Sequence, residues 1–226
     1  MGEQIVPTDE PRWHASIAVV AVVLLYITLP PKFTFGPLWL FPVLVFAVLI
    51  PLSIVSPMRH RETALQRAAS ITLIALSNLF NVISLLLLLA SLVAPHRPKL
   101  ASGEELFLAG VQIWITNILV FALWYWELDG DGPEARAHVR SAAASKSADF
   151  LFPQMSPDES HLPSIDEAWK PQFVDYLFLA FSTATALSAA DTFPISRMAK
   201  MLMMAESLVS LATIAVIVSR AINILA

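Results

Sequence analysis

A carboxylate stands inside the last apolar segment of the chain, at Glu206. Ser210 and Thr213 follow it at i+4 and i+7, so the three side chains share one face of a helix. In an antiparallel hairpin this stripe would meet Thr183 and Thr185 of the preceding apolar segment. Ionisable groups at membrane depth are costly and usually functional. One interpretation of the pattern is a polar path or an ion-binding site, with Glu206 as its carboxylate and a monovalent cation as the candidate ligand.

Two more polar residues, Ser188 and Asp191, lie between these segments and belong to the same candidate path. The alternative is purely structural, since Glu206 would also form an interhelical hydrogen bond with a Ser or Thr hydroxyl. Such bonds are common in membrane bundles and contribute on average about 0.6 kcal/mol. The sequence leaves both interpretations open. A structural ion pair between Asp175 and Arg220 is predicted to clamp the two C-terminal segments together.

Two other apolar segments carry polar patches. The residues are Ser77, Asn78, Asn81 and Ser84 in one segment, and Gln112, Thr116 and Asn117 in the other. Patches of this kind more often hold helices together than bind a ligand. Together with the Glu206 stripe they predict a bundle with a polar interior.

Other chemistry is absent from the sequence. The five histidines are scattered without ligand spacing, and with no cysteine there is neither a thiolate metal site nor a disulfide framework. The chain contains no P-loop, no G-x-S-x-G and no H-E-x-x-H motif. We therefore expect no enzymatic activity, no cofactor and no bound metal. The net charge of −4 gives no excess of positive charge of the kind that nucleic-acid-binding proteins carry.

Composition identifies the protein class. The chain is 57% hydrophobic and only 14% charged, whereas soluble domains carry about 25% charged residues. Apolar runs long enough to cross a bilayer, roughly 20 residues each, predict an all-α, polytopic transmembrane bundle. The predicted spans are approximately 13–29, 37–55, 70–93, 106–126, 173–190 and 197–226.

Three regions follow from these spans. Residues 1–126 hold four N-terminal helices, 127–172 form a polar loop, and 173–226 form a C-terminal helical hairpin. Trp124-Tyr125-Trp126 is predicted to be an aromatic belt at headgroup level, and the Asp129-Gly130-Asp131-Gly132-Pro133 run should stop the helix before it. Segment 173–190 is barely long enough to span. Five spans plus a re-entrant helix are therefore an alternative to six spans.

Positive charge predicts the orientation, because cytoplasmic loops collect Lys and Arg. Six spans with the N-terminus inside put nine basic residues inside: Arg12, Arg59, Arg61, Arg67, Arg136, Arg140, Lys146, Lys170 and Arg220. The other five lie outside: Lys32, Arg97, Lys99, Arg197 and Lys200. Both termini and the polar loop are therefore predicted to be cytoplasmic.

The C-terminal quarter resembles the pore unit of tetrameric potassium channels. Asp191, Pro194 three residues later, and Arg197 and Lys200 at the start of the next helix match its turn and inner helix. This resemblance implies a channel-like protein that forms homo-oligomers. A potassium filter, however, aims successive backbone carbonyls at the ion, and its glycines supply backbone angles that other residues resist. Ser188 and Ala190 occupy those glycine positions, so we expect no potassium-selective filter.

The same region is similar to a bacterial family of integral membrane proteins of unknown function. The matching residues are Tyr176, Phe178, Phe181, Ser182, Asp191, Ser196, Arg197, Ala221, Ile222 and Asn223. This resemblance implies a location in the bacterial inner membrane. Two functions remain for a chain of this kind in a lipid bilayer. One is a channel-like or transporter-like protein with a polar path at the C-terminal hairpin, and the other is a non-conducting scaffold that binds a partner.

Overall fold

A computed structural model describes residues 13–55, 64–93, 102–137, 148–155, 169–185 and 192–225. The larger helices are α1 (Trp13–Thr28), α2 (Leu40–Val55), α3 (Ala64–Val93), α4 (Gly103–Leu128), α6 (Phe173–Thr185) and α7 (Arg197–Leu225). The short elements are η1 (Pro31–Phe33), η3 (Asp129–Asp131), α5 (Pro133–Ala137), β1 (Phe150–Leu151), η5 (Pro153–Met155) and β2 (Phe193–Pro194). The predicted all-α helical bundle is confirmed.

Among the described residues, three helical stretches are long and apolar enough to cross a membrane: Ala64–Leu92, Gly103–Asp131 and Arg197–Ile222. Three shorter apolar helices accompany them, at Trp13–Thr28, Leu40–Ile50 and Phe173–Thr185. Much of the described surface is apolar, with large hydrophobic side chains exposed on every one of these helices. These features fit a membrane-embedded protein.

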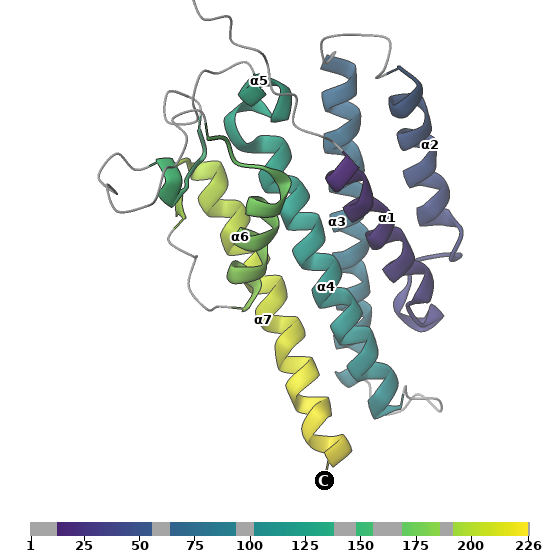
Figure 1. Cartoon of the computed structure of the whole chain (residues 1–226). Coiled ribbons are helices and arrows are strands. Elements are labelled where there is room, and N and C mark those ends of the chain that lie inside the picture. The colour runs from purple at the N-terminus through teal and green to yellow at the C-terminus, as the bar shows by residue number, and fades with distance from the viewer. Residues whose placement is uncertain are drawn as a thin grey trace, which may run out of the picture.

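Helix α4 lies at the centre of the bundle and packs against α1, α3, α6 and α7 (Figure 1). It begins with a capping box, in which the Ser102 side chain accepts from the Glu105 backbone N–H and the Glu105 carboxylate accepts from the Ser102 backbone N–H. This reciprocal pair satisfies two donors that a helix start leaves free. Fourteen of the residues of α4 are buried, which is consistent with its central place.

Helices α6 and α7 run parallel to each other, and each is antiparallel to α4. Trp126 near the end of α4 contacts Phe173 at the start of α6. Tyr125 contacts Glu206 in the first half of α7, and Gly110 near the start of α4 approaches Ile217 late in α7. Both helices therefore start at the end of the bundle where α4 ends, which is the upper end in Figure 1. The predicted antiparallel hairpin is wrong.

Helix α6 is 13 residues long, which corresponds to about 20 Å, and it stops part-way down the bundle (Figure 1). The chain is back at the upper end at β2, which pairs with β1 in antiparallel register. This geometry agrees with the re-entrant alternative for segment 173–190. The start of α1 and the end of α7 lie at opposite ends of the bundle (Figure 1). The cytoplasmic location of both termini stays a prediction.

Asp129 ties the upper end together. Its Oδ1 accepts hydrogen bonds from the backbone N–H groups of Asp149, at 2.7 Å, and Phe150, at 3.2 Å. Its Oδ2 accepts from the Tyr176 hydroxyl at 2.5 Å. One carboxylate thus joins the end of α4 to β1 and to α6. We call this group, completed by Arg136, the Asp129 clasp.

Arg136 closes the clasp from α5. Its Nη1 donates to the carbonyl oxygens of Trp126, at 2.8 Å, and Asp129. Its guanidinium also lies 5.1 Å from the centre of the Tyr176 ring, in the geometry of a cation–π contact. Nearby, Lys170 Nζ donates to the Ala137 carbonyl at 2.7 Å, and burial lowers the pKa of Lys170.

The clasp changes the interpretation of two sequence signals. The helix stop predicted at the Asp129-Gly130 run is confirmed, since α4 ends at Leu128 and Gly130 and Gly132 adopt positive φ angles of 58° and 100°. The aromatic belt is wrong for Tyr125 and Trp126, which are 0% and 5% exposed. Phe150 of β1 and Phe173 of α6 pack against their rings.

Gly110 allows the close approach of α4 and α7. A Cβ at this position would lie 2.9 Å from Ile217 Cγ1. We expect Gly110→Leu to destabilise the protein by about 1–3 kcal/mol, because overpacking forces helices apart. The measurement is the unfolding free energy in detergent micelles. Ala215→Leu, at an exposed position of α7, is the control and should change stability by less than about 0.5 kcal/mol. Equal effects of the two changes would contradict the close contact.

Candidate functional site

The stripe predicted on α7 forms its buried face. Glu206, Ser210 and Thr213 are 0%, 1% and 0% exposed. The opposite face, with Met204 and Leu208, is exposed and apolar. A helix with this distribution turns its few polar groups toward the protein, as expected in a bilayer. The stripe therefore packs against α4 and not against the surroundings.

Two side chains of α4 contact this stripe. The Tyr125 hydroxyl donates a short hydrogen bond to Glu206 Oε2. Asn117 Nδ2 donates to Ser210 Oγ at 3.0 Å and to the Glu206 carbonyl oxygen at 3.3 Å. Tyr125 and Asn117 are both fully buried. We call Glu206, Tyr125, Asn117 and Ser210 the Glu206 centre.

Helix α6 adds Thr183 to the edge of the Glu206 centre. The Thr183 side chain is within hydrogen-bonding reach of Tyr125, and its hydroxyl donates to the Leu179 carbonyl at 2.9 Å. Thr185 instead donates to the carbonyls of its own helix, those of Phe181 at 2.9 Å and Ser182 at 3.2 Å. The structure thus brings Thr183 to the centre through Tyr125. It shows no contact between the Thr185 hydroxyl and the α7 stripe within the described residues.

Not every predicted site residue is a partner of the Glu206 centre. The Thr213 hydroxyl donates to the Val209 carbonyl at 2.7 Å, inside its own helix. Ser188 and Asp191 lie outside the residues that the structure describes.

The Glu206 centre contains two unsatisfied acceptors. Within the described part of the chain, Glu206 Oε1 and Asn117 Oδ1 are buried and have no hydrogen-bond partner. Buried polar atoms are nearly always paired, so each such atom needs an explanation. A carboxyl oxygen, an amide oxygen and the Ser210 hydroxyl are all hard oxygen ligands, the type that a small cation or a proton prefers.

No basic side chain among the described residues forms an ion pair with Glu206. The nearest basic residue of α7 toward its end is Arg220, 14 positions further along and therefore about 21 Å away along the axis. Toward the start of α7, Lys200 is six positions away and exposed. An isolated buried carboxylate is strongly unfavourable, so Glu206 requires a bound proton or a bound cation. Among the described residues, no group of three acidic, His or Cys side chains forms a metal site.

The predicted ion pair between Asp175 and Arg220 is wrong. Asp175 lies in the first turn of α6 at the upper end, where its Oδ2 accepts from the Gln172 backbone N–H at 2.7 Å. Arg220 lies near the other end of α7. Because α6 and α7 are parallel and not antiparallel, residues near the start of one and the end of the other are separated by most of the bundle's length, about 30 Å at 1.5 Å per residue.

The sequence analysis did not identify Tyr125 as a site residue. Together with Trp124 and Trp126 it forms an aromatic run, which is typical of a belt at the membrane interface. A different signal was present in the sequence. Asn117 and Tyr125 are eight positions apart, close to two helical turns, and so share a face of α4. An Asn and a Tyr on one face of a long apolar helix suggest a buried polar partner opposite them.

A scan against family models, a search of curated proteins and a search of solved structures each found no match to this chain. A function can therefore be inferred only from the Glu206 centre and from the arrangement of the helices around it.

Proposed function

We propose that this protein moves a monovalent cation, a proton included, across a membrane, with Glu206 as the residue that binds it. The observation that carries the proposal is the unpartnered Oε1 of a fully buried carboxyl group beside the unpartnered Oδ1 of Asn117. The Tyr125 hydroxyl holds the other carboxyl oxygen in place. The free oxygen is thus available for a proton or a cation, which would also relieve the cost of burying the charge.

The path of the chain supports the proposal. A half-length helix, α6, enters from the end where α7 begins, and its Thr183 reaches Tyr125. A helix that enters the bundle and returns to the same end is the feature that the resemblance to potassium-channel pore units implies. Irregular backbone at membrane depth is tolerated where protein or a water-filled space surrounds it. Ser188 and Ala190 in place of filter glycines still argue against potassium selectivity.

Ion flux from purified protein in liposomes tests the proposal. We expect flux of protons, sodium or potassium above that of protein-free vesicles. Reproducible absence of flux for all three ions would favour the second candidate, a membrane scaffold in which the hydrogen bonds from Tyr125 and Asn117 hold α4 to α7. Those bonds are the observation that favours it.

We also propose an orientation of the protein in the membrane. A re-entrant path for segment 173–190 changes the end of the bundle at which several of the basic residues lie. Ten of the 14 Lys and Arg residues belong to the upper end or to the sequences joining helices there: Arg12, Arg59, Arg61, Arg67, Arg136, Arg140, Lys146, Lys170, Arg197 and Lys200. Four belong to the other end: Lys32, Arg97, Lys99 and Arg220. This bias is stronger than the nine against five of six full spans. By the positive-inside rule the upper end is cytoplasmic, and α7 ends on the outside.

Single cysteines test this orientation on a background that has none. In intact cells, a membrane-impermeant maleimide should label Ala226→Cys and should not label Ser145→Cys. Permeabilised cells should label both. Protection of both positions in intact cells would instead support six full spans. Labelling of Ser145→Cys in intact cells would reverse the orientation.

A further inference from the structure

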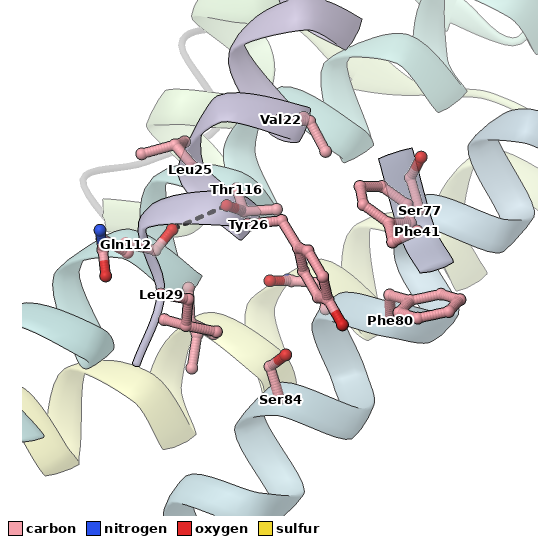
Figure 2. A pocket seen from close by; sticks show the side chains of 12 residues that line it. Val22, Leu25, Tyr26, Leu29, Phe41, Ser77, Phe80, Ser84, Gln112 and Thr116 are labelled. Atoms are coloured by element: carbon pink, nitrogen blue, oxygen red, sulfur yellow. Dashed lines mark hydrogen bonds between the residues drawn. The ribbon is translucent and has the colours of Figure 1, made fainter. Parts of the chain in front are cut away.

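A second polar region lies on the other side of α4, in a cavity between α1, α3 and α4 (Figure 2). It joins Ser77, Asn81 and Ser84 of one predicted polar patch with Gln112 and Thr116 of the other. Its lining is Val22, Leu25, Tyr26, Leu29, Phe41, Ser77, Phe80, Asn81, Ser84, Gln112, Ile113 and Thr116. Tyr26 reaches across this space between Thr116 and Phe80 (Figure 2).

Two polar atoms in this lining have no partner among the described residues. They are Asn81 Nδ2 and Ser84 Oγ, on residues that are only 4% and 1% exposed. A Ser in a membrane helix usually donates to the carbonyl four residues earlier, and Ser77 does so to Leu73 at 2.9 Å. Ser84 makes no such bond. Its hydroxyl and the Asn81 amide therefore need a partner that the described residues do not supply.

Other groups in the cavity lining can still accept hydrogen bonds. The Thr116 hydroxyl donates to the Gln112 carbonyl at 2.8 Å, and Ser77 donates as described, so each hydroxyl oxygen retains free lone pairs. The Tyr26 hydroxyl makes only a long hydrogen bond, 3.3 Å, to the Phe35 carbonyl. The cavity wall thus offers both a free donor and several free acceptors.

The occupant must be small and neutral. The space between the side chains has room for about one water molecule. No acidic side chain lines the cavity, and the free group of Asn81 is a donor, which repels a cation. A water molecule both donates and accepts, and buried waters typically make about three hydrogen bonds to otherwise unsatisfied groups.

We propose that this cavity is a water-binding site in which a buried water accepts from Asn81 Nδ2, bonds to the Ser84 hydroxyl and donates to the oxygens of α3 or α4 beside it. The water links α1, α3 and α4 where lipid could supply no hydrogen bond. This inference does not depend on the role proposed for Glu206, since the two regions use different faces of α4.

X-ray radiolytic labelling of the full chain in detergent or nanodiscs tests the site, because radicals formed from a bound water modify the side chains beside it. Phe41 lines the cavity, whereas Phe121 is equally buried, at 1% exposure, and lies outside the lining. We expect Phe41 to be modified several-fold more than Phe121. Equal modification of the two in the unaltered protein would overturn the proposal.

Variants sharpen the test. Asn81→Leu combined with Ser84→Ala removes both unsatisfied groups, and the modification of Phe41 should then fall to the level of Phe121. Ser77→Ala is the matched control, because Ser77 lines the same cavity but already has a partner. It should leave the labelling of Phe41 unchanged. Labelling of Phe41 that persists in the double variant would show that Asn81 and Ser84 do not hold the water.

Discussion

Glu206→Gln is expected to lower ion flux at least about tenfold, equivalent to about 1.4 kcal/mol of lost interaction with the ion. Glutamine has nearly the same shape as glutamate and can still accept the hydrogen bond that Tyr125 donates. It cannot carry a negative charge or a transferable proton at its free oxygen. Packing between α4 and α7 should therefore survive while ion binding is lost. The measurement is flux in liposomes at matched protein density.

Two further variants separate charge from packing at the Glu206 centre. Glu206→Asp keeps the charge and should retain part of the flux. Tyr125→Phe removes the hydrogen bond to Oε2 but leaves the carboxyl group, so it should change flux less than Glu206→Gln does. Flux in Glu206→Gln equal to that of the unaltered protein would end the role assigned to Glu206. Equal thermal stability of the variants is the check on folding.

Asp129→Ala should be the most destabilising single change at the upper end, at about 3–5 kcal/mol, because each buried donor that loses its acceptor costs about 1–3 kcal/mol. The same change leaves the Asp149 and Phe150 backbone N–H groups and the Tyr176 hydroxyl without their acceptor. Since these bonds hold β1 and α6 to the end of α4, the start of α6 should loosen first. The measurement is the unfolding free energy in detergent micelles.

Asp131→Asn is the matched control two residues away, because asparagine removes the charge and still tolerates the positive φ of 65° at this position. The Asp131 side chain is 69% exposed and lies 3.8 Å from Arg67 Nη2, an exposed pair of the kind that contributes about 0–1 kcal/mol. A loss of stability in Asp131→Asn as large as that in Asp129→Ala would mean that general charge at this end matters and not the clasp. Hydrogen exchange at Phe150 and Tyr176 gives a local readout, which should rise only in the Asp129 variant.

The residues that sequence reasoning placed correctly are those governed by local rules. Glu206, Ser210 and Thr213 share a face because helical spacing puts them there, and that face is buried because lipid does not solvate polar groups. The end of α4 before Asp129 follows from glycines and a proline that cannot continue a helix. Such features depend only on residues within a few turns of each other.

The direction of α6 was not available from local rules. Segment 173–190 has a length and polarity compatible with both a short span and a re-entrant helix, and nothing in its periodicity distinguishes them. The choice depends on long-range contacts, namely those of Tyr176 with Asp129 and of β1 with β2. The ion pair predicted between Asp175 and Arg220 assumed that segments 173–190 and 197–226 are antiparallel. Because α6 and α7 are parallel, the two residues lie at opposite ends of the bundle.

The partners of Glu206 were equally hidden. A carboxyl group on a helix face shows that something polar should lie opposite it, but not which helix supplies that group. Tyr125 and Asn117 belong to α4, more than 80 positions away along the chain, so only the packing of α7 against α4 identifies them.

By itself, the sequence determined that this chain is a bundle of apolar helices and that a carboxyl group lies on a buried polar face of the last one. Hydrophobicity and helical periodicity decide those properties residue by residue. Only the tertiary structure decided that α6 stops part-way and runs parallel to α7, that the Tyr125 hydroxyl bonds to Glu206, and that Asn81 and Ser84 share one cavity with Tyr26. These depend on which helices meet and in which direction, and that choice belongs to the packing of the whole bundle.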